Sequence, residues 1–333
     1  MLPYKHHPGE QSSCILCNSS MRYQRKFKDL EIENGFYNLL ICPKCRLGKT
    51  DPFPEEKHMK ELYSSTIYRD HESRFIHLGE KGIRIFRKFR QKRIERIVQK
   101  GRILDIGCGR GVFLSLMKES GWEAFGLELN EETAWYARNV LGLDVRTDSL
   151  VDAQFDDTFF DVITLWHVLE HLPDPLLTIE ECRRILKPGG LLIIAIPNFD
   201  SLQAIISGKH WFHLDLPYHL YHFTHKNLDL FLRKFSLRII KVKQFSLEFN
   251  PFGYLQSFLN MSHIKYNFLY TMLKSRSLRK ALSPDMKRYS LYIHLYITIL
   301  LLPLFIPLSF GLSLIESFIG RGGTIEVYAL KEG

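Results

Sequence analysis

A glycine-rich turn between a strand-like and a helix-like segment is the feature that most limits how this chain can fold. The turn lies in residues 103–111, ILDIGCGRG, and a helical pattern over residues 112–120 follows it. Glycine in such a turn lets backbone N–H groups approach a ligand without a Cβ atom in the way. The chain is therefore expected to hold a ligand where this strand ends and the helix begins.

The segments on either side of the turn continue to alternate between strand and helix patterns. We expect strands at residues 102–105, 124–129, 145–147, 160–166 and 191–196, and helices at residues 74–100, 112–120, 131–141, 174–186 and 227–234. Alternation of this length is typical of an α/β fold with a doubly wound parallel sheet. Ligands of such sheets bind beyond the carboxyl ends of the strands.

Three acidic residues lie at the end of a predicted strand or just after it, and they narrow the choice of ligand. Asp105 precedes the glycines, where it would repel a diphosphate but suit a ligand with an ammonium and a sulfonium group. The spacing GxGxG also differs from the GxGxxG of dinucleotide sites. Glu128 is placed to accept hydrogen bonds from ribose hydroxyls, and Asp148 from an adenine amino group. Alone, the glycine turn would equally fit a dinucleotide or tight packing.

Four stretches in this order resemble the class I S-adenosylmethionine-dependent methyltransferases, in the bacterial group that includes ubiquinone-pathway O-methyltransferases. They are ILDIGCGRG, GLELN, FDVITLWHVLEHLPDP and LKPGGLLIIAIPN, and the similarity returns at GRGGTIEVYALKE. The resemblance implies a methyltransferase that uses S-adenosyl-L-methionine. It also implies a Rossmann-like sheet of seven strands, in which residues 239–246 and 324–331 form an edge pair with the last strand antiparallel.

The same resemblance assigns cofactor roles to particular residues. The methionine end of the cofactor would lie against Asp105, Gly107, Gly109 and Gly111. The ribose would lie against Glu128, and the adenine against Leu129 and Asp148. His167, at the end of a predicted buried strand, would line the same pocket.

Histidines follow the predicted strand over residues 160–166. A methyl transfer needs the acceptor to be aligned and its proton removed, and a histidine suits the second task. His167 and His171 are therefore candidate bases. The pattern HxxEH also resembles an ExxEH pattern that binds a divalent cation in ubiquinone-pathway enzymes, with His167 in place of the first acid. Alternatively, His167 only lines the cofactor pocket and His171 caps a turn.

A second group of histidines lies in the segment WFHLDLPYHLYHFT and the residue before it. It contains His210, His213, His219 and His222 among aromatic residues, which suit a flat or apolar acceptor. His219 is our first choice of catalytic base, ahead of His167. The alternative is a loop whose histidines are structural.

Two CxxC pairs near the N-terminus predict a metal site. Cys14 and Cys17 form one pair and Cys42 and Cys45 the other, joined by a hairpin-length segment that alternates enough for two strands. Four thiolates close the shell of a structural zinc ion, as in a zinc ribbon. The starting sequence lacks the apolar core of a secretory signal, so we expect a reducing compartment. A zinc ribbon before this core also resembles sugar C-methyltransferases, where it packs beside the acceptor site.

Residues 249–320 separate the two predicted edge strands and form an insertion. Residues 265–288 carry seven Lys or Arg and one acid, and an almost wholly apolar stretch broken by Pro303 and Pro307 follows. Each apolar arm of about 12 residues is too short to cross a bilayer. We expect a hairpin that dips into one leaflet, with the basic stretch facing anionic headgroups. A buried helical pair or a dimer interface is the alternative.

The sequence therefore divides into a zinc-ribbon-like module (1–60), a methyltransferase core (74–248), a membrane-associating insertion (249–320) and the last core strand (321–333). The preferred interpretation is a cytoplasmic enzyme, peripheral on the membrane, that methylates a lipid-linked, isoprenoid or glycan-type acceptor. The alternatives are a soluble sugar C- or O-methyltransferase, an RNA methyltransferase, and a cofactor-binding protein without catalysis. The net charge of +9 suits a membrane face or RNA. The sequence WHVLEH differs from the NPPY-type motif of many base-modifying enzymes, which makes nucleic acid the less favoured partner.

Overall fold

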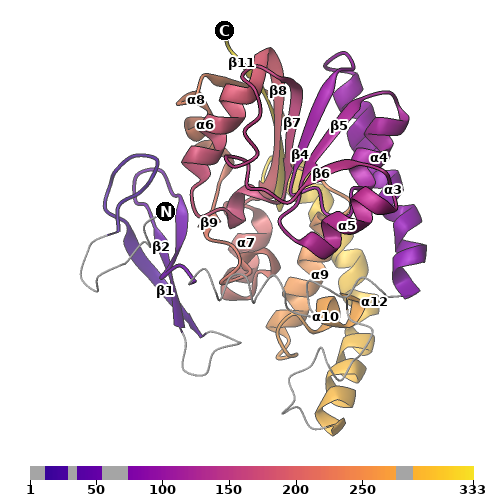
Figure 1. Cartoon of the computed structure of the whole chain (residues 1–333). Coiled ribbons are helices and arrows are strands. Elements are labelled where there is room, and N and C mark those ends of the chain that lie inside the picture. The colour runs from indigo at the N-terminus through magenta and orange to yellow at the C-terminus, as the bar shows by residue number, and fades with distance from the viewer. Residues whose placement is uncertain (1–11, 29–35, 55–73, 275–287) are drawn as a thin grey trace.

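The computed structural model of the chain describes residues 12–28, 36–54, 74–274 and 288–333. These residues form two sheets and the helices around them (Figure 1). The parts of the predicted modules at residues 1–11, 29–35, 55–73 and 275–287 lie outside the described residues, and these include most of the basic stretch.

The larger sheet has seven strands in the order β10-β11-β8-β7-β4-β5-β6. Their bounds are β4 Arg102–Ile106, β5 Glu123–Leu127, β6 Asp144–Arg146, β7 Phe160–Trp166, β8 Leu186–Pro197, β10 Leu237–Lys243 and β11 Thr324–Lys331. Strand β11 runs antiparallel to both β8 and β10, and the remaining pairs are parallel. The predicted α/β fold, with its seven-stranded sheet and antiparallel last strand, is confirmed.

Alternate residues of the central strands face two separate cores. On β8, Leu192, Ile194 and Ile196 belong to one core and Leu191 and Ile193 to the other, as the two-residue period of a strand requires. Because both faces are buried, the strand reads as a continuous apolar run.

Helices cover both faces of this sheet. Residues of α3 (Arg74–Glu95), α4 (Val112–Glu119) and α5 (Glu131–Asn139) belong to one core, and those of α6 (Pro175–Ile185) and α8 (His225–Arg233) to the other. The first helix ends earlier than the 74–100 predicted. Between β8 and α8 lie short helical turns that the sequence did not predict, α7 (Leu202–Ser207), η2 (Gly208–His210) and η3 (Phe212–Leu214).

The smaller sheet belongs to the N-terminal cysteine module. Strands β1 (Arg22–Lys28) and β2 (Phe36–Ile41) form the expected antiparallel pair, and β3 (Gly48–Asp51) adds a third strand. The fourth strand, β9 (Tyr221–His222), comes from the core. Cys14, Leu16 and Leu47 also belong to the same core cluster as residues of α6 and α8. The module is therefore joined to the core by a shared sheet and shared packing.

The described residues of the insertion form the helices α9 (Asn250–Met261), α10 (Phe268–Lys274) and α12 (Arg288–Phe318), which extend from one end of the sheet (Figure 1). The prediction of two apolar arms broken at Pro303 and Pro307 is wrong, because α12 runs through both prolines as one helix of 31 residues. The hairpin expected in one leaflet is therefore absent from the described residues.

The φ angle of proline fits a helix. Inside a helix, however, proline removes one backbone hydrogen bond and its ring clashes with the preceding turn, which together cost about 3 kcal/mol. Both prolines lie at exposed positions. The inner face of α12 packs against α9 and α10 through Leu259, Ile264 and Phe268. Packed residues lie before and after Pro303 (Leu301 and Phe305), and buried Ser309 and Ser313 follow Pro307, so contacts on the inner face hold the helix through both prolines. By length and composition, residues Tyr289–Phe318 are long and apolar enough to cross a membrane.

Candidate functional site

The glycine turn joins β4 to α4 and has three residues in the left-handed region. Gly107, Gly109 and Gly111 have φ angles of 69°, 56° and 76°. A Cβ at Gly107 would lie 2.6 Å from Val168, and one at Gly111 would lie 2.4 Å from Leu143, so these two are needed for close packing. A Cβ at Gly109 would meet nothing within 4 Å. Gly109 is therefore the place where the backbone faces open space and a ligand can approach.

Glu128 follows β5 and is bound to this turn. Its Oε2 accepts a hydrogen bond from the Gly109 N–H at 3.0 Å, and its Oε1 accepts one from the Asn130 N–H at 2.9 Å. Each oxygen keeps a lone pair, so the carboxylate can also accept from two vicinal hydroxyls. Burial raises the pKa of Glu128 above its ordinary value. The predicted ribose acceptor thus lies beside the turn, as a cofactor site of this kind requires.

Asp105 is buried at the end of β4. The Thr164 hydroxyl of the neighbouring strand β7 donates to its Oδ1 at 2.5 Å. Burial raises the pKa of Asp105 to about 7, against the opposing effects of this hydrogen bond and of Arg87 and Arg90. A cationic ligand group placed beside it would offset the cost of burying the charge.

The two residues expected at the adenine are more exposed. Leu129 is 72% exposed and follows β5, and Asp148 is exposed in the loop after β6. Both lie after strands adjacent in the sheet, on the side of Glu128. Their contact with an adenine stays a prediction.

His167 lies directly after β7, with a φ of 57°. Its ring packs against Phe249 with centroids 4.3 Å apart, and its Nδ1 lies 3.3 Å from Glu170 Oε1. Burial lowers the pKa of His167 to about 4. The side chain is thus a neutral imidazole held between the apolar ring and the acid.

Glu170, His171 and His219 come together from two segments of the chain. Each offers one potential ligand atom, and these three atoms lie within 4.8 Å of one another. The His171 and His219 rings are 4.6 Å apart. Neither carboxylate oxygen of Glu170 has a hydrogen-bond partner, although both are buried. A buried carboxylate needs a proton, a donor or a cation, so this group can hold a divalent cation or an acceptor that carries a proton.

The hydrogen bonds of His219 indicate its tautomer. Its Nδ1 lies 2.9 Å from the His213 carbonyl oxygen, which only an N–H can satisfy. Its Nε2 therefore carries the lone pair. Burial lowers the pKa of both His219 and His171 to about 4. Neutral imidazoles are what a general base or a metal ligand requires.

The remaining histidines of the second group point elsewhere. His222 Nε2 lies 3.3 Å from the Thr50 hydroxyl, His213 is buried and positions His219 through its carbonyl, and His210 is half-buried in η2. Only His219 joins the residues that follow β7.

Three residues near His167 were not predicted from the sequence. The Arg90 guanidinium lies 4.2 Å from the Trp166 ring centroid and donates to Glu248 at 2.8 Å. Phe249 packs against His167. Arg90 belongs to a helix rich in Lys and Arg, so no sequence pattern distinguishes it from the other cations. Glu248 and Phe249 follow β10 and belong to no motif. They are brought to the site only by the long-range packing of α3.

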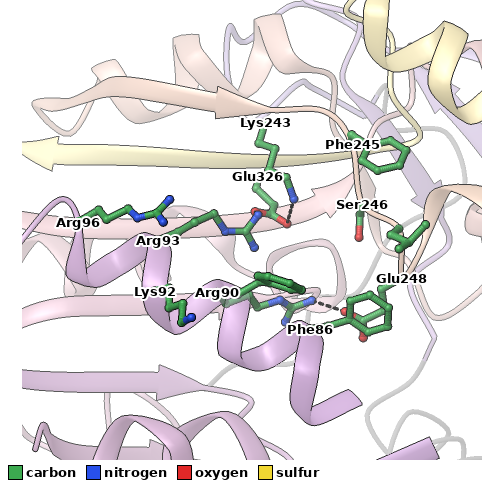
Figure 2. A pocket seen from close by; sticks show the side chains of 12 residues that line it. Phe86, Arg90, Lys92, Arg93, Arg96, Lys243, Phe245, Ser246, Glu248 and Glu326 are labelled. Atoms are coloured by element: carbon green, nitrogen blue, oxygen red, sulfur yellow. Dashed lines mark hydrogen bonds and ion pairs between the residues drawn. The ribbon is translucent and has the colours of Figure 1, made fainter. Parts of the chain in front are cut away.

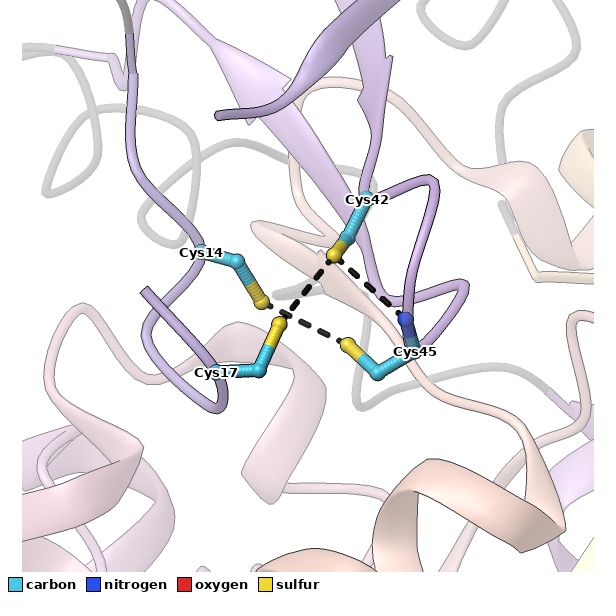
Figure 3. Close-up of side chains that lie close together, drawn as sticks. All are labelled: Cys14, Cys17, Cys42 and Cys45. Atoms are coloured by element: carbon cyan, nitrogen blue, oxygen red, sulfur yellow. Dashed lines mark hydrogen bonds between the residues drawn. The ribbon is translucent and has the colours of Figure 1, made fainter. Parts of the chain in front are cut away.

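The four predicted metal-binding cysteines form a compact group (Figure 3). Sγ of Cys14 lies 3.4 Å from that of Cys45, and Cys17 and Cys42 are separated by the same distance. All four sulfur atoms lie within 4.8 Å of one another. Tetrahedral zinc with Zn–S bonds of about 2.3 Å places its sulfurs about 3.8 Å apart, so this donor set fits a zinc ion.

Residues 78–242 match a family model described as a methyltransferase domain. A ubiquinone biosynthesis O-methyltransferase of Actinobacillus pleuropneumoniae is 36% identical over 107 residues, covering 29% of this chain and 46% of that protein. One of Methylococcus capsulatus is 32% identical over 111 residues, covering 31% and 46%. The chain thus spans about half the length of these curated relatives.

Among solved structures, a SAM-dependent methyltransferase of Archaeoglobus fulgidus is 21% identical, with 78% of this chain and all of that chain covered and a TM-score of 0.44. The family match covers the glycine turn and the strands that carry the site. This chain contains a methyltransferase domain of the S-adenosylmethionine-dependent class.

Proposed function

We propose that the chain transfers the methyl group of S-adenosyl-L-methionine to an acceptor, with His219 as the general base. One observation carries the proposal: Glu170, His171 and His219 meet after the strand that adjoins the glycine turn. In the transfer a lone pair of the acceptor attacks the methyl carbon, the carbon–sulfur bond breaks, and its electrons return to sulfur. The acceptor proton goes to Nε2 of His219.

The cofactor-binding part of the proposal rests on the turn and its acids. Gly109 leaves space for the ligand, Glu128 offers two acceptor oxygens beside it, and Asp105 offers a buried carboxyl for the ammonium group. Leu129 and Asp148 complete the proposed site at the adenine. His167 lies against Phe249, where it limits the space open to the acceptor.

A divalent cation is a second proposed occupant of the group formed by Glu170, His171 and His219. The Glu170 carboxylate, whose oxygens accept no hydrogen bond, and two neutral imidazoles fit such an ion. When bound, it would act as a Lewis acid that lowers the pKa of an acceptor hydroxyl. His219 would then be a ligand, with His167 the remaining candidate base.

The proposed acceptor is lipid-linked, isoprenoid or glycan-type, and is reached at a membrane surface. Support comes from the outer face of α12, where Tyr296, Leu300 and Leu304 are each more than 60% exposed. An apolar face of this length on a water-soluble surface is unusual and marks a lipid or protein contact. We also propose a structural zinc ion at the four cysteines and a location on the cytoplasmic face of the membrane.

A methyl-label transfer assay tests the proposal. Purified full-length protein and labelled S-adenosylmethionine are incubated with membrane, soluble-glycan and RNA fractions, and the labelled fraction is identified. We expect the label in extractable lipid. Label in soluble glycan or RNA would reject the lipid acceptor, and no label in any fraction, with the cofactor bound, would favour the non-catalytic alternative.

Variants then separate the base from the fold. His219→Ala should lower turnover by about 100-fold or more with the cofactor affinity unchanged, because general-base catalysis contributes about that much. His210→Ala, in the same segment but outside the site, is the matched control and should retain activity. Equal activity of the two variants would reject His219 as base.

A further inference from the structure

A cavity of about 440 Å³ lies between α3 and the ends of β10 and β11 (Figure 2). None of the residues predicted to bind the cofactor lines it. Its walls carry five cationic side chains, Arg90, Lys92, Arg93, Arg96 and Lys243. Against these stand two carboxylates, Glu248 and Glu326, so the lining has an excess of three positive charges.

The two carboxylates are already shared among several cations. Glu326 lies 3.3 Å from Arg93 and 3.5 Å from Lys243, and Glu248 lies 2.8 Å from Arg90. Within the part of the chain that the structure describes, no ion pair is found for Arg96 or Lys92. The cavity is therefore short of negative charge.

Two further observations concern how the cationic wall of this cavity is paired. The Arg93 Nε is shielded from solvent and has no hydrogen-bond partner. Burial also lowers the pKa of Lys243, although Glu326 opposes this shift. The negative end of the α3 dipole accounts for Lys92 and Arg93 in the last helical turn. It does not account for Lys243, which comes from strand β10.

The other walls of the cavity are aromatic or apolar. Phe86, Phe89 and Phe245 line it together with Leu247. Phe89 is 58% exposed and Leu247 is 46% exposed, so an apolar rim meets the solvent beside the cationic wall. A ligand that satisfies both walls carries an anionic group and an apolar chain.

We propose that this cavity binds the phosphoryl group of an amphiphilic ligand, with Arg96 and Lys243 as its main contacts. A phosphate or diphosphate carries two or three charges, which matches the excess, and guanidinium groups bind its oxygens through charge-assisted hydrogen bonds. The phenylalanines would pack against the apolar chain. Arg90 forms part of the cavity wall and also lies over the ring of Trp166, the residue before His167, so the cavity is connected to the proposed acceptor site through one side chain.

The inference goes beyond the proposed methyl transfer and does not depend on it, because it concerns equilibrium binding. Titration calorimetry on the full chain with inorganic pyrophosphate and with farnesyl diphosphate tests it. The pocket variant is Arg96→Gln with Lys243→Gln. The matched control is Arg84→Gln with Lys88→Gln, which removes two charges from exposed positions of α3 outside the cavity.

Both probes should bind the unmodified protein, and the pocket variant should weaken both by about tenfold or more, as expected for lost charge-assisted hydrogen bonds. The control should change affinity less than threefold. Equal losses in the two variants, or no binding of either probe to the unmodified protein, would overturn the proposal. Retained S-adenosylmethionine binding shows that the pocket variant is folded.

The two probes also distinguish the source of the phosphoryl group. If farnesyl diphosphate binds more tightly, and Phe89→Ser removes only that advantage, the pocket serves a lipid phosphate. Equal affinities for the two probes would assign it to a free phosphorylated compound instead.

Discussion

The N-terminal cysteine module and the C-terminal helices are both attached to the methyltransferase core, the module through the four-stranded sheet and the helices between β10 and β11 of the seven-stranded sheet, and they meet the site differently. The module is joined through hydrogen bonds: the Thr50 hydroxyl donates to the His219 carbonyl at 2.6 Å, and the Thr50 N–H donates to Leu220. Its second cysteine pair also contacts α8, where Asn227 donates to the Cys45 carbonyl at 3.4 Å.

The C-terminal helices are joined mainly at one end. Glu316, near the end of α12, accepts hydrogen bonds from the Gly323 N–H and the Asn250 side chain, each at 2.9 Å. Toward its beginning the helix keeps one face on α9 and α10 and exposes the other. The comparison indicates that the first attachment positions His219, the proposed base, whereas the second leaves an exposed apolar surface.

Loss of the cysteine cluster should produce the largest effect on turnover. Cys42→Ser, or metal chelation of the unmodified protein, removes the support of β3 and therefore shifts the segment with His219. We expect kcat to fall by about 100-fold or more, since a misplacement of about 1 Å can cost this much. Methyl-transfer kinetics and cofactor titration measure the two sites separately.

The cofactor affinity should stay within about threefold in the same variant, because the turn and Glu128 lie on other strands. Restoring zinc to the chelated protein should restore kcat. If the cofactor affinity falls as far as kcat, the module supports the whole fold and the comparison fails.

A smaller change within the module isolates the hydrogen bond to the site. Thr50→Val keeps the side-chain shape but loses the bonds to His219 and His222. We expect a decrease in kcat of about tenfold, equivalent to about 1.4 kcal/mol for one buried hydrogen bond. Thr178→Val, which removes a hydroxyl bond to the Asp174 carbonyl in exposed α6, should leave kcat unchanged. Equal kcat values for the two variants would contradict a positioning role of Thr50.

The sequence predicted what depends on local pattern. Short patterns of neighbouring residues identified the strands and the glycine turn. Similar patterns identified Asp105, Glu128 and the cysteine pairs. The cofactor assignment also rests on the order of these motifs, because that order resembles the order in a known family.

What depends on long-range packing could not be predicted. Strand β9 is two residues long and is held only by its pairing with β3, so no periodicity marks it. The continuity of α12 through two prolines depends on its contacts with α9 and α10. In the sequence, Arg90 does not differ from the other cations of its helix. Its contacts with Trp166 and Glu248 in the folded chain distinguish it.

The exposed face of α12 should govern membrane binding with little effect on the site. Leu300→Ser with Leu304→Ser replaces side chains that are 64% and 61% exposed, so folding should be retained. We expect binding to vesicles of phosphatidylglycerol and phosphatidylcholine to weaken by about tenfold or more, because two leucines contribute about 2 kcal/mol on transfer. Flotation measures this, and kcat for a soluble acceptor should change less than twofold.

The matched control uses one leucine and one valine of slightly lower exposure outside α12. Leu230→Ser with Val140→Ser changes two side chains that are each 53% exposed on the core, and vesicle binding should persist. If both double variants bind vesicles as the unmodified protein does, the outer face of α12 is not the lipid contact.

Asp105 is buried at the end of β4, and we expect it to affect the dependence of stability on pH. Its pKa is raised by burial from 3.8 to about 7 in the fold, so the folded state holds a proton that the unfolded state has released. The stability that this proton provides is complete below pH 3.8 and is lost as the pH rises through 7. Asp105→Asn should therefore reduce the fall in Tm over this range in the cofactor-free protein.

The same pH slope sharpens the comparison of the two attachments. Neither Thr50→Val nor the α12 double variant touches Asp105, its Thr164 partner or the burial that shifts its pKa. Both variants should therefore keep the full slope, measured by calorimetric Tm between pH 4 and pH 8, while their Tm values shift in parallel. A slope reduced in either variant, to the level of Asp105→Asn, would mean that this attachment also orders the end of β4, and that the two attachments do not act separately on the molecule.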